Sequence, residues 1–280
     1  MPVAPESSGH TNPVRCVQAV VAVLALGGTL PAPLYLLWQK QIHFSEIVLT
    51  LIFGVYFLAA VMALIFFGRL SDQIGRRPVL FVGIATGIAS TLCLIFARGL
   101  PLLFIGRFLS GFSVGLVLSA FTTFLSELIP GEASQARAAD LSVITELLGL
   151  GAGPLVGGIM AQYLGLPTLA CFYALLAMLV MVILPGSAAP ETLSRRQNLS
   201  LKPQLAMPKG KEAVFFSLAA AGFCMFAMIG LFTSLVPSML AERLHNSNHA
   251  IAGAIAFELF LVATIAAAAL RRVPSGPAIL

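Results

Sequence analysis

The sequence predicts an all-α protein that crosses a membrane several times. Hydrophobic residues make up 59% of the 280 residues and charged residues only 10%, which leaves too little polar surface to cover a water-soluble globule. Apolar runs of about 20 residues, the length that crosses roughly 30 Å of hydrocarbon, recur along the chain. Helices satisfy their own backbone hydrogen bonds in lipid, so we expect each run to form one.

Eight apolar runs predict eight transmembrane helices. The first run is too long for the core of a signal peptide, so we expect it to be retained. A hydrophilic stretch rich in Pro, Ser and basic residues divides the sixth run from the seventh. The sequence therefore predicts a six-helix bundle over residues 1–187, a central cytoplasmic loop over 188–212, and an incomplete second bundle over 213–280 with two helices and the start of a third. The predicted helices cover residues 16–38, 46–70, 78–97, 102–128, 141–164, 167–187, 213–240 and 250–270.

Lysines and arginines predict one orientation in the membrane, because short loops rich in them stay on the cytoplasmic side. With the N-terminus inside, only Lys40, Arg98 and Arg243 lie outside, and Arg107 lies within a helix. We therefore predict a multi-pass protein of the cell (inner) membrane, and we attribute the net charge of +5 to orientation rather than to nucleic-acid binding. The cytoplasmic basic residues would be Arg15, Arg69, Arg76, Arg77, Arg137, Arg195, Arg196, Lys202, Lys209, Lys211, Arg271 and Arg272.

The loop between the second and third helices, GRLSDQIGRRPVL, concentrates charge in an apolar chain. Gly68 and Gly75 allow a tight turn, and Asp72 can accept hydrogen bonds from helix N-terminal amides. Arg76 and Arg77 can fix the orientation and pair with carboxylates. The stretch closely resembles the loop signature of the major facilitator superfamily. That resemblance implies a twelve-helix fold and a cytoplasmic gate in which these five residues latch the two halves; simple anchoring of an inner loop is the alternative.

The fourth helix carries a second segment similar to this superfamily, LFIGRFLSGFSVG. A buried guanidinium is costly in lipid and needs a carboxylate, a carbonyl or a water-filled cavity beside it. The resemblance links Arg107 to proton coupling, and the alternative is an arginine that snorkels to the outer interface. Tyr35 and Trp38 are expected in the aromatic belt at that interface, and Tyr35 would contribute to recognition only if it turned inward.

The fifth helix contains ELLGLGAGPLVGG, which resembles the signature of the drug:proton antiporter branch. Gly149, Gly153 and Gly157 recur every four residues, so they form a flat stripe that another helix can approach closely. Pro154 removes a backbone hydrogen bond and bends a helix. With Gly158, these residues form the predicted helix-five pivot between two bundles; close packing without a role in transport is the alternative.

Two intramembrane acids are candidates for proton coupling, because a proton-driven carrier needs a carboxylate that changes charge during its cycle. Glu146 shares the glycine stripe of the fifth helix, and Glu258 lies near the middle of the eighth. The alternative for each is a structural role. Glu46, Glu127 and Asp140 sit at helix ends, where a solvated or capping role is expected.

The sequence offers no catalytic, cofactor-binding or metal site. It contains no GxSxG or HExxH motif, and the four cysteines fall in four different predicted helices without a CxxC pair. We therefore predict no enzyme and no cofactor. The expected partners are the lipid bilayer, a small-molecule substrate and protons, and the sequence favours a monomer without fixing the oligomeric state.

The predicted function is a secondary active transporter that exports small drug-like or metabolite compounds in exchange for protons, by alternating access of a central cavity. Uptake of a sugar or organic acid by proton symport is one alternative. The resemblance implies four further helices that this sequence does not contain, so we expect a truncated protein. A membrane protein that transports nothing is therefore the other alternative.

Overall fold

The fold consists of long helices, and the connections between those up to residue 188 are short, in a computed structural model that describes residues 12–164, 166–193, 216, 217, 220, 224, 228, 230 and 248–270. Every regular element in these residues is a helix. Seven helical segments within them are long and apolar enough to cross a membrane. The predicted all-α membrane fold is therefore confirmed. The predicted seventh helix (213–240), the loop from 194 to 212 and residues 271–280 lie wholly or mostly outside the described residues.

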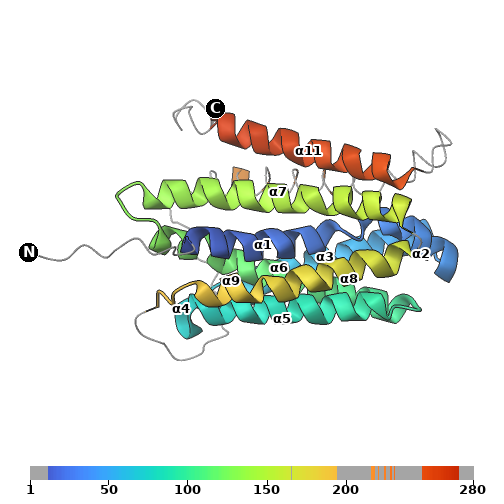
Figure 1. The fold of residues 1–280 in the computed structure, drawn as a ribbon, viewed down its shortest axis with the longest axis horizontal. Coiled ribbons are helices and arrows are strands. Elements are labelled where there is room, and N and C mark those ends of the chain that lie inside the picture. Colours follow the sequence, from blue (N-terminus) through green and yellow to red (C-terminus); the bar gives the residue numbers. More distant parts are fainter. Residues whose placement is uncertain are drawn as a thin grey trace, which may run out of the picture.

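The elements follow one another in an up-and-down order along the chain (Figure 1). Short polar caps begin two of them, since Asn12 Oδ1 accepts a hydrogen bond from the Val14 amide at 3.1 Å and Ser45 Oγ accepts one from the Val48 amide at 3.5 Å. The elements are α1 (Pro13–Thr29), η1 (Ala32–Leu34), α2 (Tyr35–Ile42), α3 (Glu46–Phe67), α4 (Leu70–Ile74), α5 (Arg76–Ile95), α6 (Leu100–Leu128), α7 (Ser134–Tyr163), α8 (Pro167–Met181), α9 (Ile183–Ala188) and α11 (His249–Leu270).

Two predicted helices are broken where a single one was expected. The first ends at Thr29 and continues as η1 and α2, because Pro31 and Pro33 have no amide hydrogen to extend the α-helical ladder. The sixth divides at Val182 into α8 and α9. Conversely, the fifth helix begins at Ser134, seven residues before the predicted start, since the polar first two turns of α7 lie outside the apolar run.

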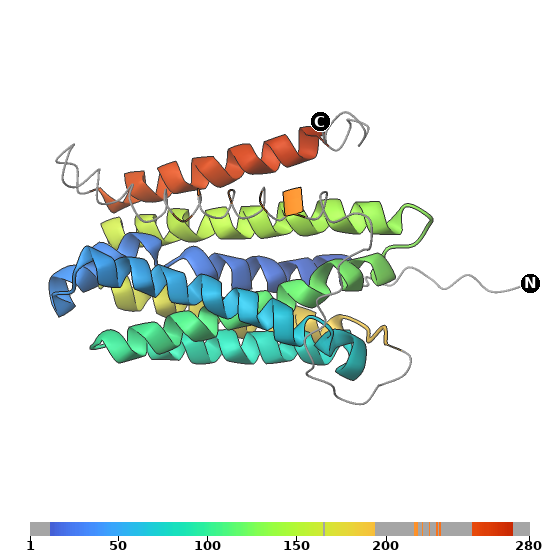
Figure 2. The same cartoon turned by 180° about the vertical axis from the view of Figure 1, so that it is seen from behind.

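Helix α6 lies at the centre of the first six spans and packs against α1, α3, α5 and α7. The core between them is apolar and includes Leu24, Ile84, Phe121 and Leu175. Helix α7 lies between α1 and α11 (Figure 1). Figure 2, the view from behind, shows α3 in front, on the face that is turned away in Figure 1. Among the described elements, α11 packs mainly along α7, so α7 joins it to the rest of the molecule.

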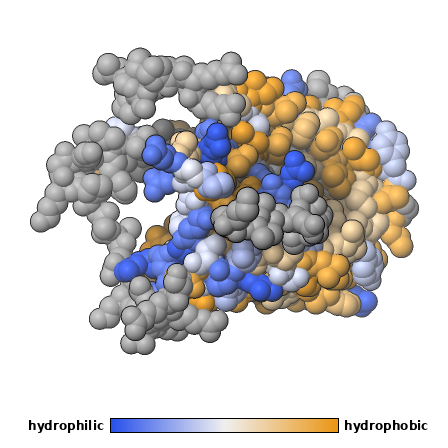
Figure 3. All heavy atoms as spheres, turned by 60° about the vertical axis from the view of Figure 1, so that its left-hand side comes forward, coloured by the Kyte–Doolittle hydropathy of each residue, from blue (hydrophilic) through white to orange (hydrophobic). Residues whose placement is uncertain are grey.

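Polar residues gather at the end of the molecule where α4 and the α6–α7 connection lie. Figure 3 views this end obliquely, with hydrophilic residues grouped on it and hydrophobic residues covering the flanks. The exposed flanks carry large apolar side chains such as Leu58 and Ile65 on α3 and Ile265 on α11. This distribution suits a protein whose sides contact lipid and whose ends contact water.

Candidate functional site: a charged turn, a buried arginine and a glycine-faced helix

The turn between α3 and α5 is organised around the side chain of Arg76. This side chain is 6% exposed and forms an ion pair with Asp72, one turn earlier. Its Nη1 also donates to Ser71 Oγ at 2.8 Å. Its Nε and Nη2 donate to the two carboxylate oxygens of Glu127 on α6, at 3.2 and 2.9 Å. This two-pronged contact holds the planar guanidinium against the end of α6.

Glu191, which follows α9, caps the N-terminus of α5. Its two carboxylate oxygens accept hydrogen bonds from the backbone amides of Arg76 and Arg77, at 3.0 and 3.1 Å. These amides have no acceptor within their own helix, and the positive end of the helix dipole favours a carboxylate there. The neighbouring Thr192 hydroxyl donates to Glu127. The segment after α9 is thereby attached to α5 and α6.

Gly75 makes this cap possible in two ways. Its φ of 115° is a conformation that residues with side chains rarely adopt. A Cβ atom there would also overlap the carboxylate of Glu191. The other predicted gate residues lie around it: Gly68 ends α3, and the Arg77 guanidinium lies 5.8 Å from the centre of the Phe81 ring.

The structure changes two assignments at this turn. The acceptor for the helix amides is Glu191, whereas Asp72 pairs with Arg76. Glu127 forms an ion pair rather than serving only as a solvated or capping residue. Glu127 and Glu191 lie far from the turn in sequence, at the end of α6 and just after α9, so local spacing could not pair them with the turn.

Arg107 is the largest fully buried side chain described, at 2% exposure. Its Nη1 donates to the backbone carbonyl of Gly28 on α1 at 2.7 Å, and its guanidinium carbon lies 4.3 Å from the centre of the Tyr56 ring. Its Nε has no hydrogen-bond partner among the described residues. The side chain therefore points into the bundle instead of snorkelling to the interface. The face of the Tyr56 ring and the carbonyl oxygen of Gly28 stabilise its positive charge.

Two small residues of α6 bring α3 close enough for this contact. A Cβ at Gly111 would overlap the carbonyl of Tyr56, and one at Gly115 would overlap that of Ala60. Gly111 and Gly115 follow Arg107 by four and eight residues on the same helix, and this four-residue spacing keeps them on one face. The helix crossing therefore places the Tyr56 ring beside the guanidinium.

Tyr35 and Trp38 are buried, so their predicted place in an exposed aromatic belt is wrong. Each is 2% exposed. Tyr35 turns inward, with its ring 6.0 Å from the Arg107 guanidinium, and its hydroxyl has no partner among the described residues. Trp38 stacks on Phe172 of α8 at 5.5 Å. The break after α1 redirects this segment over the end of the bundle, which the unbroken helix of the sequence-based prediction could not show.

The two candidate acids lie in different surroundings. Glu146 is half-buried on α7. Glu258 is exposed on α11. Because Gly253 and Phe260 face α7, helical periodicity places Glu258 on the other side of α11. Glu146 thus lies partly within the bundle, whereas Glu258 lies on the exposed face of α11.

Helix α7 presents small residues on two sides. Toward α1, a Cβ at Gly149 would crowd the backbone of Ala22, and one at Gly153 or Gly157 would overlap backbone at Leu26 or Leu30. Toward α11, Gly158 meets the backbone of His249 and Gly253, and the carbonyl of Pro154 meets Gly253. The predicted stripe therefore packs on α1, while Pro154 and Gly158 form a separate contact with α11.

The described residues contain no group of three or more His, Cys, Asp or Glu side chains placed to hold a metal ion. The chemistry that the described interior offers is therefore that of a buried cation, aromatic rings and a half-buried acid.

Comparison with known proteins supports the resemblance found in the sequence. The sequence model of the Major Facilitator Superfamily matches residues 19–280. The chain is 34% identical over 112 residues to the Major facilitator superfamily multidrug transporter mfsB of Aspergillus fumigatus, which covers 40% of this chain and 18% of that protein. It is 23% identical over 241 residues to the Quinolone resistance protein NorA of Staphylococcus aureus, covering 84% of this chain and 60% of NorA.

A solved structure shares the fold. The human organic anion transporter MFSD10 (TETRAN) superposes with a TM-score of 0.63 at 18% identity, over 95% of this chain and 74% of that one. The matches to mfsB and NorA each span less than two thirds of those proteins.

Proposed function

The chain belongs to the major facilitator superfamily, and from this we propose that it acts as a secondary active transporter that exports small drug-like or metabolite compounds in exchange for protons. Two relatives with drug-related names, mfsB and NorA, support export as the direction. The proposed cycle exposes a central cavity alternately to the two sides of the membrane. Residues 1–187 form one moving body in this proposal, 213–280 belong to the other, and 188–212 link them.

The two-sided packing of α7 is the observation that carries this proposal. Gly149, Gly153 and Gly157 pack α7 against α1 of the first body, while Pro154 and Gly158 meet Gly253 of α11 in the second. Contacts made through glycine and backbone have few interdigitating side chains, so two helices can rotate against each other without forcing rotamer changes. We assign α7 the role of pivot on this basis.

The charged turn serves as the cytoplasmic gate in this proposal. Gly68, Asp72, Gly75, Arg76 and Arg77 form the latch, with Glu127 and Glu191 as its fixed supports. The side chain of Asp72 is 46% accessible, so a basic group of the second body can reach it. The turn lies at the same end as Asn12, which agrees with a cytoplasmic N-terminus.

Proton coupling is assigned to Arg107 and Glu146, with Glu258 as a further candidate on α11. Arg107 is buried and contacts the Gly28 carbonyl and the Tyr56 ring, so its charge would stabilise a negative charge brought near it. In this proposal, protonation of the half-buried Glu146 changes the electrostatic field at Arg107, whose guanidinium contacts the Tyr56 ring. Binding of a proton and binding of a substrate at this site would then be linked.

Vesicle transport with one pair of glycine variants tests the proposal. Gly158 meets the backbone of α11, whereas a Cβ at Gly54 of α3 has nothing within 4 Å. In proteoliposomes with an imposed proton gradient, the unaltered protein is expected to move ethidium, a lipophilic cation, and to move protons in return. Gly158→Leu should abolish both fluxes, and Gly54→Leu should leave them intact.

The possible outcomes separate the alternatives. Full flux of ethidium and protons in Gly158→Leu would rule out α7 as the pivot. Unchanged proton flux in Glu146→Gln would rule out a role of Glu146 in proton coupling. Proton-driven accumulation of a sugar or organic acid, without ethidium movement, would establish uptake instead of export. Absence of every flux in a correctly inserted protein would favour a membrane protein that transports nothing.

A further inference from the structure

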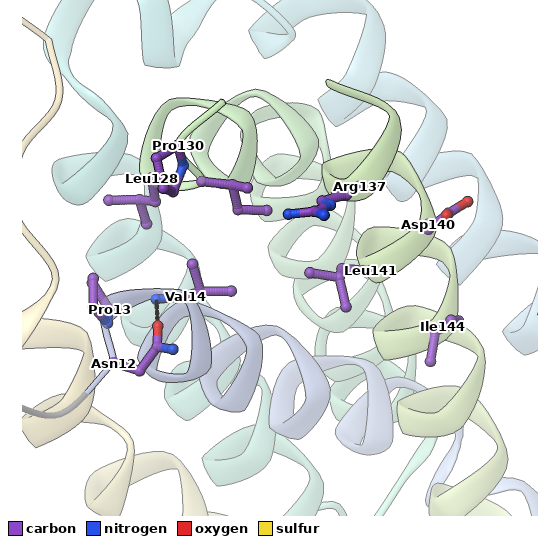
Figure 4. A pocket seen from close by; sticks show the side chains of 10 residues that line it. Asn12, Pro13, Val14, Leu128, Pro130, Arg137, Asp140, Leu141 and Ile144 are labelled. Atoms are coloured by element: carbon purple, nitrogen blue, oxygen red, sulfur yellow. Dashed lines mark hydrogen bonds between the residues drawn. The ribbon is translucent and has the colours of Figure 1, made fainter. Parts of the chain in front are cut away.

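A pocket of about 470 Å³ opens between the ends of α1, α6 and α7 (Figure 4). Its volume lies in the range of natural ligand sites. It is separate from the Arg107 neighbourhood, because its lining comes from the first residues of α1 and α7 and the last residues of α6. The lining residues are Asn12, Pro13, Val14, Leu128, Ile129, Pro130, Arg137, Asp140, Leu141 and Ile144.

The walls of this pocket are mainly apolar, and its polar lining residues are Asn12, Arg137 and Asp140. Figure 4 shows the Arg137 side chain extending from α7 into the space between α6 and α1, while Asp140, on the same helix, points away from it. Val14, Leu141 and Ile144 line the space beneath the guanidinium. A mainly apolar pocket into which an arginine side chain extends is complementary to an amphiphile that carries an anionic group on an apolar body.

The level of the pocket relative to the membrane narrows the class of ligand. Pro13 is the first residue of one membrane-spanning segment and Leu128 is the last of another, so the pocket lies where apolar helix gives way to the polar end. Headgroup phosphates and the first methylenes of lipid chains occupy this level. Basic pockets between transmembrane helices at this depth bind anionic lipid headgroups.

We propose that this pocket binds an anionic phospholipid of the leaflet that contacts this end of the molecule. Arg137 would bind the phosphate, and Val14, Leu141 and Ile144 would contact the upper part of an acyl chain. The site would hold one lipid and tie together the ends of three helices that belong to the same bundle. This assignment does not depend on transport, because it concerns a resident lipid and not a solute that moves through the protein.

The test uses the purified full chain in a neutral detergent, titrated with dioleoylphosphatidylglycerol. The readouts are the midpoint of thermal unfolding and the number of lipids retained in native mass spectrometry. Phosphatidylglycerol should raise the midpoint and leave one bound lipid, while dioleoylphosphatidylcholine, which has the same chains and no net charge, should do neither. Arg137→Gln should weaken the apparent affinity about fivefold, the effect of one arginine near a lipid surface.

Two matched variants separate the pocket from the general charge of this end. Arg15 is an exposed arginine next to Val14 that does not line the pocket, so Arg15→Gln should leave the affinity unchanged. Leu141→Trp should fill the apolar part and weaken binding while Arg137 remains. The proposal would be overturned if Arg15→Gln and Arg137→Gln lost the same affinity for phosphatidylglycerol, or if phosphatidylcholine bound as well as phosphatidylglycerol. Equal stabilisation by inorganic phosphate alone would reassign the pocket to a soluble anion and overturn the lipid assignment.

Discussion

Two buried arginines of this chain are stabilised in different ways. Arg76, at the end of the bundle, has two carboxylate partners and a serine hydroxyl. Arg107, in the interior, has a carbonyl at 2.7 Å and the face of Tyr56. Two carboxylates neutralise the charge of a guanidinium and hold it in position. A carbonyl and an aromatic ring carry no net charge, so the guanidinium remains a net cation. The first arrangement suits a structural clamp, and the second leaves a cation able to respond to an added negative charge.

Gly75→Ala is expected to destabilise the protein more than Gly131→Ala. Both glycines have positive φ, 115° and 102°, so alanine strains each backbone by about 1–2 kcal/mol. Only at Gly75 does a Cβ also meet the Glu191 carboxylate, while at Gly131 nothing lies within 4 Å. Gly75→Ala should therefore lose the α5 cap as well, at a further cost of about 1 kcal/mol. Thermal unfolding in detergent measures the difference, and equal midpoints for the two variants would contradict it.

At the scale of the elements, the long apolar helices were predictable and their interruptions were less so. Composition and the length of the apolar runs were enough to predict α3, α5 and α6, because a lipid-facing helix must be apolar for most of its length. The break after Thr29 was not predicted, although Pro31 and Pro33 were visible in the sequence, since prolines also occur within transmembrane helices.

The candidate site was predictable in part for a related physical reason. Local spacing identifies the turn from Gly68 to Arg77 and the stripe from Gly149 to Gly157, because both depend on neighbours along the chain. The partners of these residues are distant in sequence: Glu127 and Glu191 for Arg76, and Tyr56 for Arg107. Such pairings follow from how helices cross, and one sequence does not specify those crossings.

Glu191→Ala is expected to destabilise the first turn of α5. The variant removes the acceptors of the Arg76 and Arg77 amides, which lie at 3.0 and 3.1 Å, and loss of a helix cap costs about 1–2 kcal/mol. Hydrogen–deuterium exchange should accelerate at these amides and remain slow in the middle of α5, around Gly83 and Gly87. Glu191→Gln, which retains one oxygen acceptor, should give an intermediate rate. Unchanged exchange in Glu191→Ala would show that another group caps the helix.

At the scale of the whole molecule, polar and apolar surfaces are segregated between the ends and flanks (Figure 3). The connections α3–α4–α5 and α6–α7 lie at one end together with Asn12, and α2 and the α5–α6 connection lie at the other (Figure 1). Basic residues favour the first end, which holds Arg15, Arg69 and Arg137. The positive-inside bias then predicts that this end is cytoplasmic.

Cysteine labelling in intact cells checks this orientation. In a background with the four native cysteines replaced, Gln41→Cys near the end of α2 should react with a membrane-impermeant maleimide. Glu132→Cys in the α6–α7 connection should react only after the membrane is permeabilised. Both native side chains are exposed, so accessibility within the protein is matched. The reverse pattern would invert the topology and place the charged turn outside.

The packing of α7 on both sides restricts how this helix can vary in sequence. Any added methyl group at Gly153 or Gly158 meets the backbone of a neighbouring helix, and main chain cannot move aside as a side chain can. Leu148 and Ile159, in contrast, are exposed on the same helix. A deep mutational scan should therefore find that the two faces of α7 that contact α1 and α11 tolerate almost no substitution. The exposed face, which carries Leu148 and Ile159, should accept exchange among apolar residues. A pivot of the kind proposed, built from close backbone contacts, would therefore tolerate almost no sequence change where the helices meet.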